Sequence, residues 1–166
     1  VLQSLGLTVE DLPEGWRASL SGQVPSRPET FDFECFSDTF LTLAAAAPLL
    51  SFPVTIRGIG HTRFQETDRI HAAATELRRA GAVVEAGEDY LGIQPFAKSR
   101  PTGSDPVLVK TYRDHRVAMS FAIAGCHDLG GIGKPWLGVR DPSCCGKTFP
   151  GFFAVLEDLY QKCHDR

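Results

Sequence analysis

The sequence has no apolar run long enough to cross a membrane. The longest, Leu41 to Leu50, falls well short of the ~20 residues that a spanning helix needs. No charged leader precedes a hydrophobic segment and a small-residue cleavage site, so no secretory signal is visible. The chain also begins without Met, inside an apparent helix. We therefore expect a fragment of a longer protein, located in the cytoplasm, or in a plastid if that longer protein carries a transit peptide.

A cysteine framework and an excess of charge are also missing. The five cysteines are an odd number, and their spacing fits neither a zinc site nor a dense set of disulfides. Adjacent cysteines such as Cys144 and Cys145 rarely have good bridging geometry, so we expect reduced thiols. The net charge of −3 gives no indication of a nucleic-acid partner or an acidic membrane surface.

What is present is an ordinary globular composition that contains an internal repeat. Two kinds of segment each occur twice. Residues 2–20 and 76–93 both read as a helix end, a glycine and two short strands. Residues 31–50 and 107–125 both read as a short strand, a polar pair and a long apolar helix. This alternation of strands and helices predicts an α/β fold with parallel strand pairs.

The repeat divides the chain into three parts. The order in each repeat is strand, helix, strand, helix, strand, strand. We expect residues 1–30 to be the tail of one repeat, residues 31–98 a complete repeat, and residues 99–166 a last, incomplete repeat. A polar stretch over 96–106 is the predicted linker between repeats.

Helix faces can be assigned from the same pattern. In the helix expected near Glu66, Gly81 is a natural C-cap. The helices after Asp38 and Asp114 are apolar on all sides, so we expect them in the interior. The helix near Glu66 is amphipathic: its apolar face holds Ile70, Ala73, Ala74, Leu77 and Ala80, and its polar face holds Glu76, Arg78 and Arg79.

Polar groups open each of the four expected helices. Arg69, Arg116 and Lys147 place positive charge near helix starts, where the helix dipole disfavours cations and the free N–H groups favour anions. The repetition suggests one shared anionic ligand. Taken singly, the same residues also fit helix caps, a surface ion pair, a solvated lysine or a structural histidine. The four openings are Ser37-Asp38, Glu66 to Arg69, Asp114 to Arg116 and Lys147-Thr148.

Three segments resemble the C-terminal signatures of the 5-enolpyruvylshikimate-3-phosphate synthases. They are "FQETDRIHAAATELRRAGAVVEAGEDY", "YRDHRVAMSFAIAG" and "RDPSCCGKTFPGFF". The similarity is collinear from about Phe31 to Leu159, and the related transferases that act on UDP-N-acetylglucosamine fit less well. The resemblance implies an inside-out α/β barrel, made of βαβαββ repeats around interior helices, of which this chain is a partial C-terminal domain.

The resemblance also implies an activity and its substrates. This family moves the enolpyruvyl group of phosphoenolpyruvate onto the 5-hydroxyl of shikimate 3-phosphate, with release of phosphate and with no metal or organic cofactor. Both substrates would bind between this chain and the missing N-terminal domain of the same polypeptide. The fragment alone is expected to be inactive.

Individual roles follow from the matched positions. Asp38 matches the proton acceptor near the target hydroxyl, and Glu66 matches the acid that protonates the methylene carbon. His115 would orient its neighbours, with Asp114 beside it as a supporting residue. The residues that match the phosphoenolpyruvate-binding cations are Arg69, Arg116 and Lys147.

The sequence also departs from the family. Gln65 stands where a lysine that contacts shikimate 3-phosphate is usual, and His61 stands where Asn is common. We predict that His61 partly replaces the missing donor. Arg113 stands where Asn or Asp is usual. Two other interpretations stay open: an enolpyruvyl transferase with another acceptor, which Gln65 favours, and a non-catalytic anion-binding or interaction domain.

Overall fold

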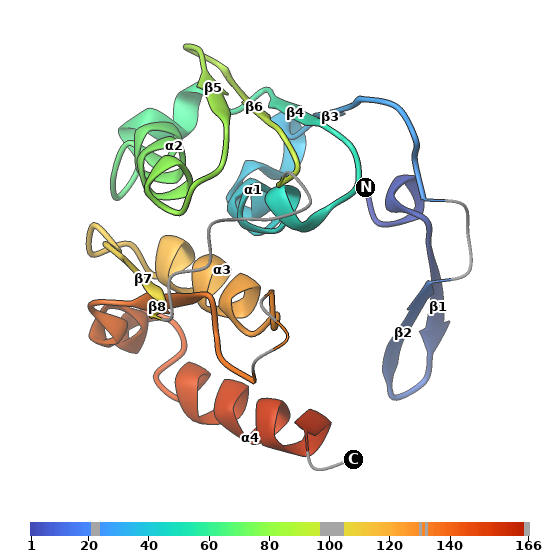
Figure 1. Cartoon of the computed structure of the whole chain (residues 1–166), viewed down its shortest axis with the longest axis vertical. Helices are drawn as coiled ribbons and strands as arrows, with labels where there is room; N and C mark the ends of the chain where they lie inside the picture. The colour runs from blue at the N-terminus through green and yellow to red at the C-terminus, as the bar shows by residue number, and fades with distance from the viewer. Residues whose placement is uncertain (21–23, 97–104, 130, 132, 165–166) are drawn as a thin grey trace.

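The computed structural model describes the chain except residues 21–23, 97–104, 130, 132 and 165–166 (Figure 1). It is an α/β structure, as the sequence predicts. The helices are α1 (Phe40–Ala46), α2 (Arg69–Arg79), α3 (His115–Gly125) and α4 (Phe152–His164). Short 3-10 segments are η1 (Gln3–Leu5), η2 (Glu34–Thr39), η3 (Ala47–Leu49), η4 (Gly60–Phe64) and η5 (Pro142–Lys147). The strands are β1 (Leu7–Leu12), β2 (Gly15–Leu20), β3 (Glu29–Asp32), β4 (Val54–Arg57), β5 (Val84–Ala86), β6 (Tyr90–Ile93), β7 (Val107–Val109) and β8 (Leu137–Val139).

The strands of the described residues form three sheets. β3 and β4 pair in parallel, and an antiparallel β6 and then β5 extend that sheet to the order β3-β4-β6-β5. β7 and β8 form a second parallel pair, and β1 and β2 form a hairpin that projects from the rest of the molecule (Figure 1). The predicted parallel pairs are therefore confirmed at both places.

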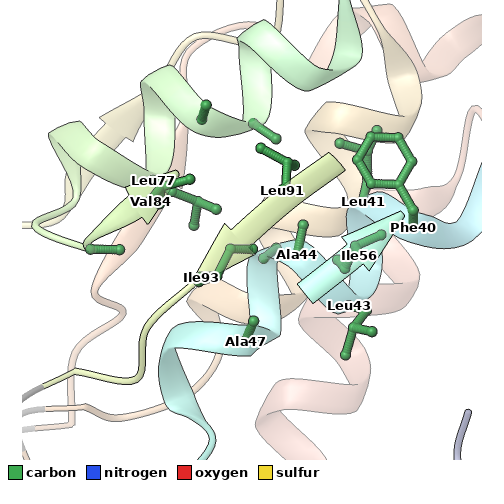
Figure 2. Close-up of a cluster of buried hydrophobic side chains, with 14 of the residues drawn as sticks. Phe40, Leu41, Leu43, Ala44, Ala47, Ile56, Leu77, Val84, Leu91 and Ile93 are labelled. Carbon is green, nitrogen blue, oxygen red and sulfur yellow. The ribbon is translucent and has the colours of Figure 1, made fainter. Parts of the chain in front are cut away.

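The core lies between the four-stranded sheet and the helices. α1 packs against both α2 and α3. Figure 2 shows side chains of α1, α2 and the sheet meeting in one cluster, among them Leu41, Ile56, Leu77 and Leu91. α1 and α3 are largely interior, as predicted, although Ile123 of α3 is 47% exposed. Interior helices with strands outside them agree with the inside-out arrangement.

The element order follows the predicted repeat. β3, α1, β4, α2, β5 and β6 give one full set, and β7, α3, β8 and α4 give the first four members of another. The predicted linker over 96–106 lies mostly outside the described residues. The repeat boundaries after residues 30 and 98 stay predictions.

The structure corrects three of the expected helix starts. Asp38 lies in η2, and α1 begins two residues later at Phe40. Glu66 precedes α2, which Asp68 caps by accepting a hydrogen bond from the His71 N–H. Lys147 ends η5, and α4 begins only at Phe152, because Pro150 and Gly151 separate the two segments. Only the helix after Asp114 starts where the sequence predicts.

One face assignment is also wrong. Glu76 was expected on the polar face of α2, but its residue surface is only 1% exposed. Gly81 lies just after the C-cap Ala80, with a φ of 90°, and in this conformation glycine carries no steric cost. Within the described ranges, no helix has the length and apolar content to span a bilayer.

Candidate functional site

Two carboxylates and two guanidinium groups join the starts of α1, α2 and α3. Arg69, whose side chain is 3% exposed, donates from Nε to Asp114 Oδ2 at 2.8 Å and from Nη1 to Asp38 Oδ1 at 3.1 Å. Arg116 reaches the other oxygen of Asp38, with Nη2 2.9 Å from Oδ2. Asp38 thus lies between two cations from two different helices, and its side chain is still 51% exposed to an incoming ligand.

The position of Asp114 follows from local geometry. It is the N-cap of α3, and its Oδ1 accepts hydrogen bonds from the backbone N–H groups of Arg116 at 2.8 Å and Val117 at 3.4 Å. The chain reaches this cap through Tyr112 and Arg113, which both have left-handed φ values, 55° and 62°. Such backbone costs a non-glycine residue roughly 1–2 kcal/mol. Two strained residues therefore come just before the aspartate that holds Arg69.

A second group forms around Glu66. Its Oε1 accepts a hydrogen bond from Lys147 Nζ at 2.5 Å, and its Oε2 lies 3.1 Å from His115 Nδ1. The hydrogen bond from Lys147 lowers the pKa of Glu66 below its ordinary value; burial opposes that shift, and His115 adds to it. Lys147 is 70% exposed on its side chain, whereas His115 is 9% exposed. The histidine side chain is therefore nearly buried, and the lysine side chain lies largely in solvent.

The two groups meet at the start of α3, where Asp114 and His115 are consecutive. Ligand atoms of Glu66, Asp114 and His115 lie within 4.8 Å of one another. These atoms are already engaged, because Lys147 and His115 bind Glu66 and Arg69 binds Asp114. This donor set is therefore already neutralised by cations, which is poor chemistry for holding a metal ion.

Gln65 and His61 lie beside the first group. Gln65 Oε1 accepts a hydrogen bond from Arg69 Nη1, so the residue in the usual lysine position faces inward to the arginine. His61 Nε2 lies 2.7 Å from Ser37 Oγ, one residue before Asp38. All nine predicted site residues thus lie at one end of the helices. Their individual roles stay predictions.

The charges differ from the sequence-based expectation. The cations were expected to repel one another unless an anion bound among them. Instead, carboxylates of the chain neutralise them: Asp114 pairs with Arg69, Asp38 with Arg69 and Arg116, and Glu66 with Lys147. The free site is therefore a set of paired charges and not a purely positive one.

Two residues that hold the site were not recognised from the sequence. Asp89 accepts hydrogen bonds from the N–H groups of Gly58 and Gly60, and Arg63 donates to Asp68 at 2.6 Å and to the Gly87 carbonyl. Together they fix the segment that carries His61 and Gln65. The glycines at 58 and 60 were the only signal in the sequence, because a close backbone approach commonly requires glycine.

The sequence of this chain matches one family of known proteins over most of its length. Residues 1–156 match the family described as EPSP synthase (3-phosphoshikimate 1-carboxyvinyltransferase). A 3-phosphoshikimate 1-carboxyvinyltransferase of Opitutus terrae is 50% identical over 148 residues, which are 88% of this chain and 32% of that protein. The chloroplastic one of Brassica napus is 43% identical over 122 residues, 74% of this chain and 22% of that protein.

A solved structure shows the same fold. The EPSP synthase of Acinetobacter baumannii superposes with a TM-score of 0.65 at 23% identity, over 95% of this chain and 37% of that one. The chain thus spans about a third of the length of the relatives it matches. A family match over residues 1–156, together with an α/β fold shared with a solved member, means that this chain belongs to the EPSP synthase (3-phosphoshikimate 1-carboxyvinyltransferase) family.

Proposed function

We propose that this chain supplies the phosphoenolpyruvate-binding part of an enzyme that transfers an enolpyruvyl group to the 5-hydroxyl of shikimate 3-phosphate. The observation that carries the proposal is the convergence of three cations, Arg69, Arg116 and Lys147, with two separately held carboxylates. Arginine and lysine stabilise phosphate and carboxylate by charge-assisted hydrogen bonds. The remaining two thirds of the relatives' length would bind the rest of the substrates.

The two carboxylates have environments that suit different tasks. Asp38 contacts two arginines and its side chain is half exposed, so it can reach the attacking hydroxyl and accept its proton. The hydroxyl oxygen then bonds to C2 of phosphoenolpyruvate, and Glu66 delivers a proton to the methylene carbon. Glu66, now a carboxylate, takes a proton back from the resulting methyl group, which restores the double bond as the bond between C2 and the phosphate oxygen breaks. Phosphate leaves with the proton that Asp38 accepted.

Glu66 must change state to donate a proton. In the free site Lys147 lowers the pKa of Glu66 and so keeps it ionised. A phosphate group that draws Lys147 away removes that hydrogen bond and adds a negative charge nearby. Both effects raise the pKa of Glu66. Substrate binding thus prepares the acid that the reaction needs.

Arg116 is the second cation that can exchange a carboxylate of the chain for an anionic group of the substrate. It pairs with Asp38 in the free site, and its side chain is 36% exposed. A substrate carboxylate or phosphate that takes over Arg116 leaves one oxygen of Asp38 without that partner, so this oxygen can accept a hydrogen bond from the substrate hydroxyl. Arg69, by contrast, is buried and keeps its bond to Asp114. The structure thus supports one fixed cation and two exchangeable ones.

The test uses the completed enzyme, meaning this chain joined to the remaining length that its relatives carry. Phosphate release with both substrates is measured for the unchanged protein and for Asp38→Asn. Loss of a general base should lower kcat by about 10²–10⁴-fold. Asp158→Asn, which removes an exposed partner of Lys162, is the matched control. No phosphate release from the unchanged enzyme, or full activity of Asp38→Asn, would contradict the proposal.

A second candidate is transfer to another hydroxyl acceptor. Gln65 favours it, because this residue carries no positive charge and its side-chain oxygen already accepts a hydrogen bond from Arg69. Calorimetric titration of the completed enzyme separates the two. Binding of shikimate 3-phosphate supports the first function, whereas binding of phosphoenolpyruvate with no response to shikimate 3-phosphate supports the second.

Location in the cytoplasm or a plastid stays a prediction, and the relatives include bacterial and chloroplastic proteins.

A further inference from the structure

Glu76 is a buried acid that the proposed reaction does not use. It lies in α2 with 1% of its surface exposed, and three donors surround its carboxylate. Oε2 accepts from Arg79 Nη1 and from the Lys110 N–H at 3.1 Å, and Oε1 accepts from the Tyr112 hydroxyl at 2.9 Å. A buried carboxylate is tolerated only when such partners satisfy it. The Glu76 carboxylate is therefore satisfied only while these three donors keep their positions around it.

The groups that Glu76 holds lie on the path from β7 to the site. Lys110 directly follows β7, and Tyr112 is the first of the two residues with left-handed backbone. The turn closes with a hydrogen bond of 2.9 Å from the Asp114 N–H to the Thr111 carbonyl. Residues in this conformation persist only where their surroundings fix them. The carboxylate of Glu76 therefore binds this turn at its first residue, Lys110, and at Tyr112, the first residue with left-handed backbone.

The same helix meets the far end of this turn through Arg69. Arg69 and Glu76 are seven residues apart in α2 and so lie on one face of the helix. Arg69 binds Asp114, just after the turn, and Glu76 binds Lys110 and Tyr112 within it. The two contacts fix where Asp114 lies relative to α2, and hence the directions of Arg69 and of the start of α3 that carries Arg116.

From this geometry we propose that Glu76 is a positioning residue for the anion-binding cations, acting through the turn over 110–113. The inference rests on the proposed function for its substrate, phosphoenolpyruvate. It goes beyond a stabilising role, since the turn that Glu76 holds leads directly to Asp114, the partner of Arg69. Among the described residues, the hydrogen-bond partners of the Glu76 carboxylate beyond α2 are Lys110 and Tyr112, both in the segment that leads into Asp114.

The test compares Michaelis constants in the completed enzyme. Glu76→Gln keeps the shape but leaves one oxygen and one NH₂ group where two oxygens served three donors. We expect KM for phosphoenolpyruvate to rise on the order of tenfold, and KM for shikimate 3-phosphate to rise less, because misplaced cations weaken binding of the anion they hold. Tyr112→Phe removes one of the three bonds and should give a smaller shift in the same direction. Tyr112→Phe alone tests the proposal if Glu76→Gln fails to fold.

Glu85→Gln is the matched control, because Glu85 accepts a hydrogen bond from the Tyr90 hydroxyl at an exposed position. It should change neither constant. If Glu76→Gln and Tyr112→Phe lower the melting temperature but leave both KM values unchanged, Glu76 is merely structural and the proposal is overturned.

A second measurement does not depend on activity. The Arg69 Nε–H is buried and bonded to Asp114, so its proton should give a protected NMR signal in the completed enzyme. Glu76→Gln should shift that signal or expose it to exchange, and an unchanged signal would overturn the proposal. If the unchanged enzyme releases no phosphate, the proposed function fails, but this signal still decides the role of Glu76.

Discussion

At the residue scale, the site depends on how differently its ion pairs are buried. Arg69 and Asp114 are 3% and 0% exposed, whereas Lys147 of the Glu66 pair is 70% exposed. Removal of one partner from a buried pair leaves an uncompensated charge in a low dielectric, and an exposed pair contributes little. The first pair therefore contributes to the stability of the fold, and the second can exchange partners at little cost in stability.

Asp114→Asn tests the buried pair. Asn still caps a helix well, so the change mainly removes the negative charge that Arg69 needs. We expect the free energy of unfolding to fall by about 3–5 kcal/mol, measured by urea denaturation. Asp158→Asn breaks an exposed pair in α4 and should cost under about 1 kcal/mol. Equal effects of the two variants would show that Asp114 is not a buried charge partner.

Lys147→Met tests the exposed pair through its pH dependence. Lys147 lowers the folded-state pKa of Glu66 below 4.5, so the pair stabilises the fold above that pH and its contribution disappears as pH falls through the folded pKa. In Lys147→Met the pKa of Glu66 should rise, as a carboxyl NMR titration would report. The loss of stability at pH 7 should be under about 1 kcal/mol and should vanish in acid. Lys162→Met should leave the Glu66 titration unchanged; an unchanged titration in Lys147→Met would contradict the pairing.

At the element scale, local signals predicted the structure only where they were strong. The strand Val54–Arg57 and the helix that Asp114 caps are where the sequence places them, because alternation and capping act within a few residues. The helix near Glu66 begins at Arg69, the last residue of its predicted opening, because Asp68 is the cap, and the start near Lys147 was misplaced because Pro150 lies just downstream. The burial of Glu76 could not be predicted, since two of its three partners, Lys110 and Tyr112, lie more than thirty residues away.

The contact between α3 and β8 gives an element-scale prediction. A Cβ at Gly125 would lie 2.7 Å from the Leu137 carbonyl oxygen, which is backbone and cannot move alone. Gly125→Ala should therefore destabilise the protein by about 1–3 kcal/mol despite the better helix propensity of alanine. Gly146→Ala is the control, because nothing lies within 4 Å of its Cβ. Thermal unfolding compares the two; a Gly125→Ala protein as stable as the control would mean that α3 is not held this close to β8.

At the scale of the whole molecule, the repeat pattern predicted which distant residues meet. Asp38, Arg69 and Asp114 are separated by 31 and 45 residues, yet each lies at or just before the start of a helix, the first two in the repeat over 31–98 and Asp114 in the next repeat. Equivalent positions in packed repeats converge at one end, and so the shared site was predictable without contacts. The pairing of each cation with a carboxylate was not, because side-chain partners depend on the packed geometry.

The chain's share of its relatives leads to the last prediction. It spans about a third of their length, and it holds one set of cations and two carboxylates. Catalysis needs both reactants fixed near each other, an effect that reaches effective molarities of about 10⁵–10⁸ M. The 166-residue chain alone should therefore release no phosphate above background from phosphoenolpyruvate and shikimate 3-phosphate, whereas the completed enzyme should turn over. Both are assayed at equal concentration, with Asp38→Asn of the completed enzyme as the blank. Turnover by the isolated chain would mean that all the groups needed for positioning and proton transfer already lie within these residues.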